Sequence, residues 1–336
     1  MQSGLRGVAE GVRQQATEAT EDAAMGPYGY SLHHLEDLTQ FAFDSLAEVE
    51  KAGAGSDELA YALQYFKGAC YTADAILRLH PKSCYSAPWG RQIWNPTSLQ
   101  VLARVLMEAC ANFHHFTLDA KDGNERELRF ILANLDCVRE REDRAAYAEK
   151  QMEKRGARPP SIPADWSGLS SEEQQALFPW AQRAKLLDSL QYWRERLRQN
   201  HFLPCAERTK WLDGTGLYNK NGEYNGRWKN AGFSGRPFYC RARNAGVPDG
   251  VLWRLQRQFS THVHMAPHAV DQIRAFYSVD SIGRGSLVEF PVTVSAAVLA
   301  LAIGGILQLY PACRGEAEPR VAGIARRLSS RAQGSG

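Results

Sequence analysis

With 336 residues, of which 44% are hydrophobic and 23% charged, the chain has the composition of a globular protein that buries a core. A formal net charge of +3 excludes binding to polyanions by overall charge alone, but the charge is unevenly distributed. Residues 1–50 hold nine acids against two arginines, a balance of −7, and residues 205–248 hold eight Lys/Arg against three acids, a balance of +5. The second segment is therefore suited to an acidic partner, or it is a solvated loop with extra lysines.

Helical patterning dominates the chain. Apolar residues recur at the spacing of an amphipathic helix, and Ser56-Asp57-Glu58 and Ser170-Ser171-Glu172-Glu173 are typical helix starts. The ranges with this pattern are 32–52, 57–79, 98–118, 124–152, 170–200, 250–265, 267–278 and 288–310. No alternating run is long enough to require a sheet. We therefore predict an all-α, multi-helix bundle of about seven or eight helices.

One long segment departs from this pattern. Residues 203–249 are rich in glycine, asparagine and aromatic residues and have no helical period, which is typical either of a functional segment or of a small irregular insertion. We expect a single helical domain over 28–312 that contains this insertion. A polar flexible tail at 1–27 and a basic flexible tail at 313–336 are expected on either side of the domain.

The cysteines and the known motifs exclude several classes of site. The seven cysteines are scattered without a Cys-x-x-Cys pair, which argues against a zinc site and against a disulfide framework. The sequence has no phosphate-binding loop, no nucleophile elbow and no His-Glu-x-x-His motif, so neither a metal nor a cofactor is expected. The polar, acidic start of the chain lacks the apolar segment of a signal peptide, which predicts a cytoplasmic protein with reduced cysteines.

An apolar run near the end raises the question of a membrane. Phe290–Cys313 is 24 residues without a charge, which is long enough to span a bilayer. The arginines after it would place the C-terminus in the cytoplasm and the large N-terminal part outside, without an export signal. A central bundle helix that is apolar on all sides explains the same composition. The core helix is favoured, and a membrane anchor formed by residues 290–310 is the alternative.

The stretch Trp253–His264 predicts one helix with three reactive side chains along a single face. At 100° per residue, Ser260 lies about 60° from Arg257, and His264 about 20° from it. Arginine can clamp a phosphate and histidine can move protons near neutral pH, as metal-independent RNA cleavage requires. His262 is a second candidate, although it lies about 140° from Arg257. The alternative is an ordinary helix whose histidine makes a buried hydrogen bond.

A second group lies on the predicted helix over 98–118. Arg104, Glu108 and His115 are separated by four and seven residues, which places them on one stripe within about 40°. Apolar neighbours such as Val105 predict that the helix is mostly covered, so the charge pair would be partly buried and would need partners. The stripe either supports the predicted catalytic helix or forms a structural ion pair.

Aromatic and basic residues alternate in the 205–248 segment. Its candidate nucleic-acid-binding residues are Trp228, Lys229, Arg236 and Arg241. Aromatic rings between cations can stack on bases while the cations hold phosphates, which makes RNA the candidate partner. The same residues are equally suited to holding an irregular loop against the bundle.

Two of these motifs resemble a bacterial family known as domain of unknown function 5677. The helix L-A-R-V-L-M-E-A carries Arg104 and Glu108 in the family's Arg-x-x-x-Glu pattern. The run from Trp228 through W-K-N-A-G-F to R-Q-F-S-T-H-V-H carries Ser260 and His264 in its Ser-x-x-x-His pattern. The likeness covers about residues 35–310, and it implies a helical domain without an established activity.

A looser resemblance concerns the Arg-x4–6-His spacing, which is similar to that of the HEPN superfamily of helical RNA-processing domains. It implies a homodimeric, metal-independent ribonuclease of a defence or stress system, with His264 as the acid/base group, Arg257 as the phosphate clamp and Ser260 as the orienting residue. The sequence departs from the first family's pattern at Gln258 and Phe259, where a tyrosine and a leucine tend to precede the serine. It departs from the HEPN pattern at Gln258, where Asn, His or Asp usually follows the arginine. A non-catalytic helical module that binds a partner protein is the alternative to an enzyme.

Overall fold

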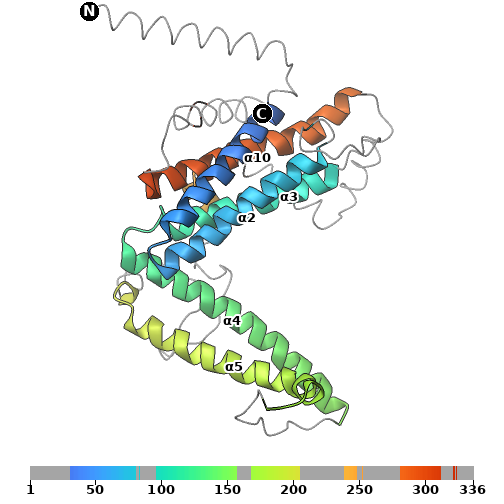
Figure 1. Cartoon of the computed structure of the whole chain (residues 1–336), viewed down its shortest axis with the longest axis vertical. Helices are drawn as coiled ribbons and strands as arrows, with labels where there is room; N and C mark the ends of the chain where they lie inside the picture. Colours follow the sequence, from blue (N-terminus) through green and yellow to red (C-terminus); the bar gives the residue numbers. More distant parts are fainter. Residues whose placement is uncertain are drawn as a thin grey trace, which may run out of the picture. The chain divides into compact units, whose positions relative to one another are not determined.

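The computed structural model shows an all-α protein, as the sequence predicts. It describes residues 31–80, 83, 96–156, 168–204, 238–247, 252, 281–311, 321 and 323 (Figure 1). Of the described residues 87% are helical, and no strand occurs among them. The chain groups into two compact units, and the single helical domain expected over 28–312 stays a prediction. Unit 1 comprises Met1–Asp119 and Tyr239–Gly336, and unit 2 comprises Ala120–Phe238.

Unit 1 is built around α3. Residues 31–52 form its first helix, followed by α2 (Asp57–Leu79) and α3 (Pro96–Phe116), and α10 (Ser281–Leu309) packs on both α3 and α2. The predicted start of α2 is confirmed, because the Ser56 hydroxyl accepts a hydrogen bond from the Leu59 amide. Residues at helical spacing form the core, including Leu35, Leu38, Phe66, Ile76, Leu106, Phe113, Leu299 and Ile303.

The apolar helix α10 lies within this core. Val288–Leu309 is long and apolar enough to cross a membrane, and 72% of its most hydrophobic window is buried inside the protein. The helix begins at Ser281, earlier than the predicted 288, and Pro291 lies inside it. This share of burial is compatible with a core helix, and the core helix and the membrane anchor at residues 290–310 both stay predictions.

The contact between α3 and α10 is close because of one glycine. A Cβ atom on Gly305 would come within 2.8 Å of Phe113 Cε1 and 3.2 Å of Leu118 Cδ1. Beside this contact, His114 Nε2 lies 3.1 Å from the Leu301 carbonyl oxygen. The absence of a side chain at Gly305 therefore lets the two backbones approach and brings the His114 ring to α10.

Unit 2 contains a pair of long helices. They are α4 (Gly123–Lys154) and α5 (Ser171–Gln199), which pack against each other and agree closely with the predicted 124–152 and 170–200. The Ser170 start is confirmed as a capping box with Glu173. The core between the helices comprises Leu128, Ile131, Leu132, Leu135, Val138, Leu186, Leu190, Leu197, Phe202 and Leu203.

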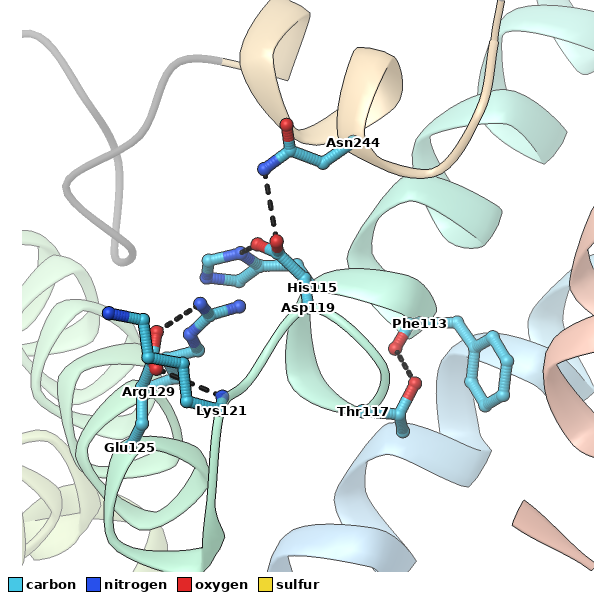
Figure 2. A network of polar contacts seen from close by, with 8 residues as sticks. All are labelled: Phe113, His115, Thr117, Asp119, Lys121, Glu125, Arg129 and Asn244. Carbon is cyan, nitrogen blue, oxygen red and sulfur yellow. Dashed lines mark hydrogen bonds and ion pairs between the residues drawn. The ribbon is translucent and has the colours of Figure 1, made fainter. Parts of the chain in front are cut away.

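Ion pairs accompany this apolar core. Glu125 and Arg129, one turn apart on α4, form a fully buried pair (Figure 2). Arg183 of α5 binds both Glu142 and Glu149 of α4, with its Nε 3.2 Å from Glu142 Oε1. The contacts of Arg183 link α5 to α4, whereas the Glu125–Arg129 pair lies within α4, where each buried charge has its partner because an unpaired buried charge is costly.

The irregular insertion expected over 203–249 contains a short helix. α7 (Phe238–Asn244) lies in unit 1 from Tyr239 onward and buries Ala242. The prediction was wrong for these residues because seven residues are only two turns, too few for a hydrophobic period to be recognised. The rest of the predicted insertion from 205 to 237 lies outside the described residues.

Candidate functional site

The structure describes only part of the predicted site. Arg257, Ser260, His262 and His264, together with Trp228, Lys229 and Arg236, lie outside the described residues. The described candidates are Arg104, Glu108, His115 and Arg241. All four belong to unit 1, three on α3 and one on α7.

Arg104 and Glu108 form an ion pair on successive turns of α3. The Arg104 Nε donates a hydrogen bond to Glu108 Oε1 at 2.6 Å. The Arg104 side chain is 19% exposed and that of Glu108 is 46% exposed, so the pair reaches the surface on the Glu108 side. Val105, expected to help cover the helix, is itself 45% exposed, which leaves this side of α3 more open than the sequence indicates.

Arg241 of α7 is electrostatically influenced by this pair. The residue is only 9% exposed, and burial lowers the pKa of its side chain, while the charges of Tyr65 and Glu108 oppose that shift. These electrostatic interactions connect α7 to α3 and, through Tyr65, to α2. We call Arg104, Glu108, Arg241 and Tyr65 the polar cluster.

Aromatic packing holds Tyr65 in place. Its ring stacks on Phe116, with centroids 5.6 Å apart and planes 9° from parallel. Tyr61 meets both rings edge-on, and the Tyr61 and Tyr65 hydroxyl oxygens are 3.2 Å apart. Such contacts fix the phenol in a defined orientation beside Arg241.

His115 belongs to a separate, buried network at the end of α3. Its side chain is fully buried, and its Nδ1 lies 3.5 Å from Asp119 Oδ2. The Asn244 amide donates a hydrogen bond to the other Asp119 oxygen at 3.1 Å, so Asp119 lies between α3 and α7 (Figure 2). The His115 ring is closed to solvent, and its contacts anchor α7 to α3.

α7 and the turn after it approach the rest of unit 1 at Asn244 and Gly246. Asn244 binds Asp119, and a Cβ atom added to Gly246 would lie 3.5 Å from Leu301 Cδ2. Gly246 has φ +90°, a conformation that glycine adopts without strain.

The described residues offer no metal centre. No group of three or more His, Cys, Asp or Glu side chains gathers among them. Cys70 and Cys110 are buried and free, and burial raises the pKa of Cys70 to about 12 and raises that of Cys110 as well. Cys137 is exposed, although its sequence context is apolar. Raised pKa values make the two buried thiols poor nucleophiles.

No protein-family model matches the chain, and no curated protein or solved structure matches it significantly. The resemblances to domain of unknown function 5677 and to the HEPN superfamily stay proposals.

Sequence reasoning missed two residues of this region. Asn112 follows Glu108 by one turn, so the spacing Arg104-x3-Glu108-x3-Asn112 could have identified it as part of the stripe. Tyr65 lies on α2, and no local signal connects it to Arg241.

Proposed function

We propose that the chain is a helical, metal-independent ribonuclease with HEPN-like chemistry, working in the cytoplasm in a defence or stress system. His264 would be the acid/base residue, Arg257 the phosphate clamp and Ser260 the orienting group. The Arg104–Glu108 ion pair supports the proposal, because it pairs the charged residues of the α3 stripe, and the charge of Glu108 also acts on Arg241 of the basic segment that the sequence associates with RNA.

The chemistry needs a base, an acid and a cation. A base removes the proton of a ribose 2′-hydroxyl, the 2′-oxygen attacks the adjacent phosphorus, and the 5′-oxygen leaves with a proton from an acid. The products are a 2′,3′-cyclic phosphate and a 5′-hydroxyl, so no oxidant or co-reactant is consumed. Guanidinium groups stabilise the charge that develops on the phosphorane, which is the role that arginines of this site would take.

The test is RNA cleavage in the presence of EDTA. We expect the wild type to cleave a single-stranded RNA and His264→Ala to lose at least about a hundredfold in rate, the usual contribution of general acid–base catalysis. His33→Ala changes an exposed histidine on the first helix and serves as the control. Equal cleavage by the wild type and His264→Ala, or no cleavage by either, would exclude the proposal.

The alternative, a helical interaction module, is favoured by one observation. Four of the large hydrophobic side chains that are exposed lie on the α4–α5 pair, namely Tyr147, Phe178, Leu187 and Tyr192. Exposed aromatic side chains of this kind are common where proteins associate. This alternative predicts that the wild type sediments as a homodimer and that Tyr147→Ser with Tyr192→Ser sediments as a monomer. A monomeric wild type with EDTA-resistant ribonuclease activity would exclude it.

A further inference from the structure

We infer that one face of α5 is a docking groove for an acidic amphipathic helix of a partner protein, which places an apolar side chain on Leu187 and carboxylates on Arg194 and Arg198. The groove has a volume of about 600 Å³ and is lined by Leu187, Gln191, Arg194, Glu195 and Arg198, and we call it the α5 groove. The inference goes beyond the proposed function, because the groove lies in unit 2 and its occupation requires no ribonuclease activity.

The residues of the α5 groove follow the helical period. Four of them are separated by four, three and four residues, which places them along one stripe of α5, namely Leu187, Gln191, Arg194 and Arg198. All four are exposed. A stripe with this spacing is the surface along which a second helix packs in a coiled coil.

The packing of α5 on α4 holds the groove in place. Three groove residues directly follow leucines that are buried in the core between α4 and α5, the pairs being Leu186 and Leu187, Leu190 and Gln191, and Leu197 and Arg198. Successive residues lie 100° apart around a helix, so the groove is about a quarter-turn from the face that packs on α4. Because the core fixes the backbone of α5, a partner would bind with little ordering of this backbone.

One end of the α5 groove is apolar. The side chain of Leu187 is 48% exposed there, and its contact with an apolar side chain of a partner would remove apolar surface from water. Gln191 is next along the stripe, and its amide makes no hydrogen bond with another described residue. The amide is therefore available to a polar group of the partner.

The other end of the groove carries two guanidinium groups. The Arg198 side chain is 72% exposed, and its Nη1 lies 3.2 Å from Glu195 Oε2. Gln199 Nε2 donates a hydrogen bond to the other Glu195 oxygen at 2.9 Å, so both carboxylate oxygens are bound within α5. A guanidinium has five N–H donors, and this ion pair uses one of those of Arg198. Arg194 lies one turn earlier, so carboxylates at the same spacing on a partner could face both arginines.

The position of the two arginines favours an antiparallel partner helix. Arg194 and Arg198 lie in the last turns of α5, which ends at Gln199. An antiparallel partner would bring its N-terminus to this end, and acidic residues are most favourable at the N-terminus of a helix. The expected partner sequence therefore has two acidic residues four positions apart and an apolar residue seven positions after the second of them, opposite Leu187.

A strand of RNA is less well suited to the α5 groove. Its phosphates would pass the carboxylate of Glu195 at one end and the aliphatic side chain of Leu187 at the other. Like charges repel and a phosphate gains nothing from an aliphatic neighbour, whereas an amphipathic helix offers one suitable side chain to each part of the stripe. RNA is therefore an alternative occupant that the experiment has to exclude.

The experiment measures binding of a fluorescent, alanine-rich peptide to the full chain by fluorescence anisotropy. The peptide has about 20 residues, enough to be helical in water, and carries two glutamates and a leucine at the expected spacing. We expect saturable binding to the wild type. Arg198→Gln should bind roughly two- to fivefold more weakly, as for an exposed ion pair, and Leu187→Ser roughly three- to tenfold more weakly. A peptide whose second glutamate is moved by two positions should also bind more weakly, because that side chain leaves the stripe.

The matched control is Arg144→Gln. Arg144 forms an exposed i,i+4 ion pair with Glu140 on α4, so the variant removes the same charge as Arg198→Gln without touching the groove. It should bind the peptide as the wild type does. Leu187 and Arg198 are exposed side chains, so both groove variants are expected to fold.

Three outcomes would overturn the inference. The first is the absence of saturable peptide binding to the wild type, or equal weakening by Arg198→Gln and Arg144→Gln. The second is binding of a uridine oligonucleotide, in place of the peptide, that Arg198→Gln weakens, which would assign the groove to RNA. The third is sedimentation of the wild type as a dimer that Leu187→Ser and Arg198→Gln dissociate, which would assign the groove to a second copy of the chain.

Discussion

Two adjacent histidines of α3, His114 and His115, lie in different surroundings. His115 is enclosed with Asp119, whereas His114 faces α10 and lies 3.1 Å from the Leu301 carbonyl oxygen. A carbonyl only accepts hydrogen bonds, so His114 Nε2 must carry the hydrogen that it donates. Burial lowers the pKa of His114, although its bond to Leu301 and the charge of Asp119 oppose the shift. The folded protein therefore favours the neutral ring.

Because the folded protein favours the neutral ring of His114, we predict that it loses stability in mild acid. The unfolded chain takes up a proton at His114 near its ordinary pKa of 6.5, and the folded chain does so only at lower pH. The stability that neutral His114 contributes is therefore fully present above pH 6.5. It is lost as the pH falls toward the pKa of His114 in the folded protein, by up to about 1.4 kcal/mol per pH unit. His114→Gln keeps a donor that does not titrate, so it should lose less stability than the wild type between pH 7 and pH 5.

The measurement is the free energy of unfolding in urea at both pH values. His33→Gln, at an exposed position of the first helix, should behave as the wild type does. If His114→Gln and the wild type lose stability equally, the neutral state of His114 in the folded protein is refuted.

For single residues, the sequence predicted pairs within one helix and missed pairs between residues that lie far apart in the chain. The Arg104–Glu108 pair follows from helical spacing and is confirmed by its 2.6 Å bond. The approach of Tyr65 and Arg241 joins residues 176 positions apart, since 241 − 65 = 176, and depends on how α7 docks. No periodicity within one element contains that information.

Among the elements, the predicted boundaries are most accurate where caps are local. α2, α4 and α5 begin at Ser56, Asp122 and Ser170, each of which accepts a hydrogen bond from a backbone amide three residues later. α10 starts earlier than predicted, because Gly283 and Gly285 in its first turns weaken the sequence signal. α7 was missed because tertiary contacts, rather than a repeated pattern, hold it.

The contact of α10 with α3 predicts opposite effects at two adjacent glycines. Gly305→Ala should destabilise the protein by about 1–3 kcal/mol, because the new methyl group collides with Phe113. Gly304→Ala has no atom within 4 Å of the added Cβ and should be neutral or stabilising by up to about 1 kcal/mol, since alanine favours helix. Urea unfolding of both variants measures the difference. Equal effects would show that α10 does not pack on α3 through Gly305.

For the whole molecule, the separation into two units was not predicted. The α4–α5 pair has a core of its own between its facing leucines. Helical periodicity identifies which face of a helix is buried without identifying the helix that buries it. For that reason the sequence gives no distinction between one bundle and two units.

The two units predict localised responses to core substitutions. Ile131→Ala in α4 and Ile76→Ala in α2 both remove fully buried side chains, and each should cost about 2–5 kcal/mol. Hydrogen exchange measured by mass spectrometry should show faster exchange mainly in α4 and α5 for the first variant, and mainly in α2, α3 and α10 for the second. Uniform acceleration along the whole chain in both variants would contradict the division.

The account depends most on the electrostatic interaction of Glu108 on α3 with Arg241 on α7, and a double-mutant cycle tests it directly. Unfolding free energies would be measured for the wild type, Glu108→Gln, Arg241→Gln and the double variant. We predict a coupling energy of about 1 kcal/mol or more, because each single substitution removes the other residue's charged neighbour. Additive effects, within about 0.3 kcal/mol, would mean that the two side chains do not interact, and the polar cluster would not exist as described.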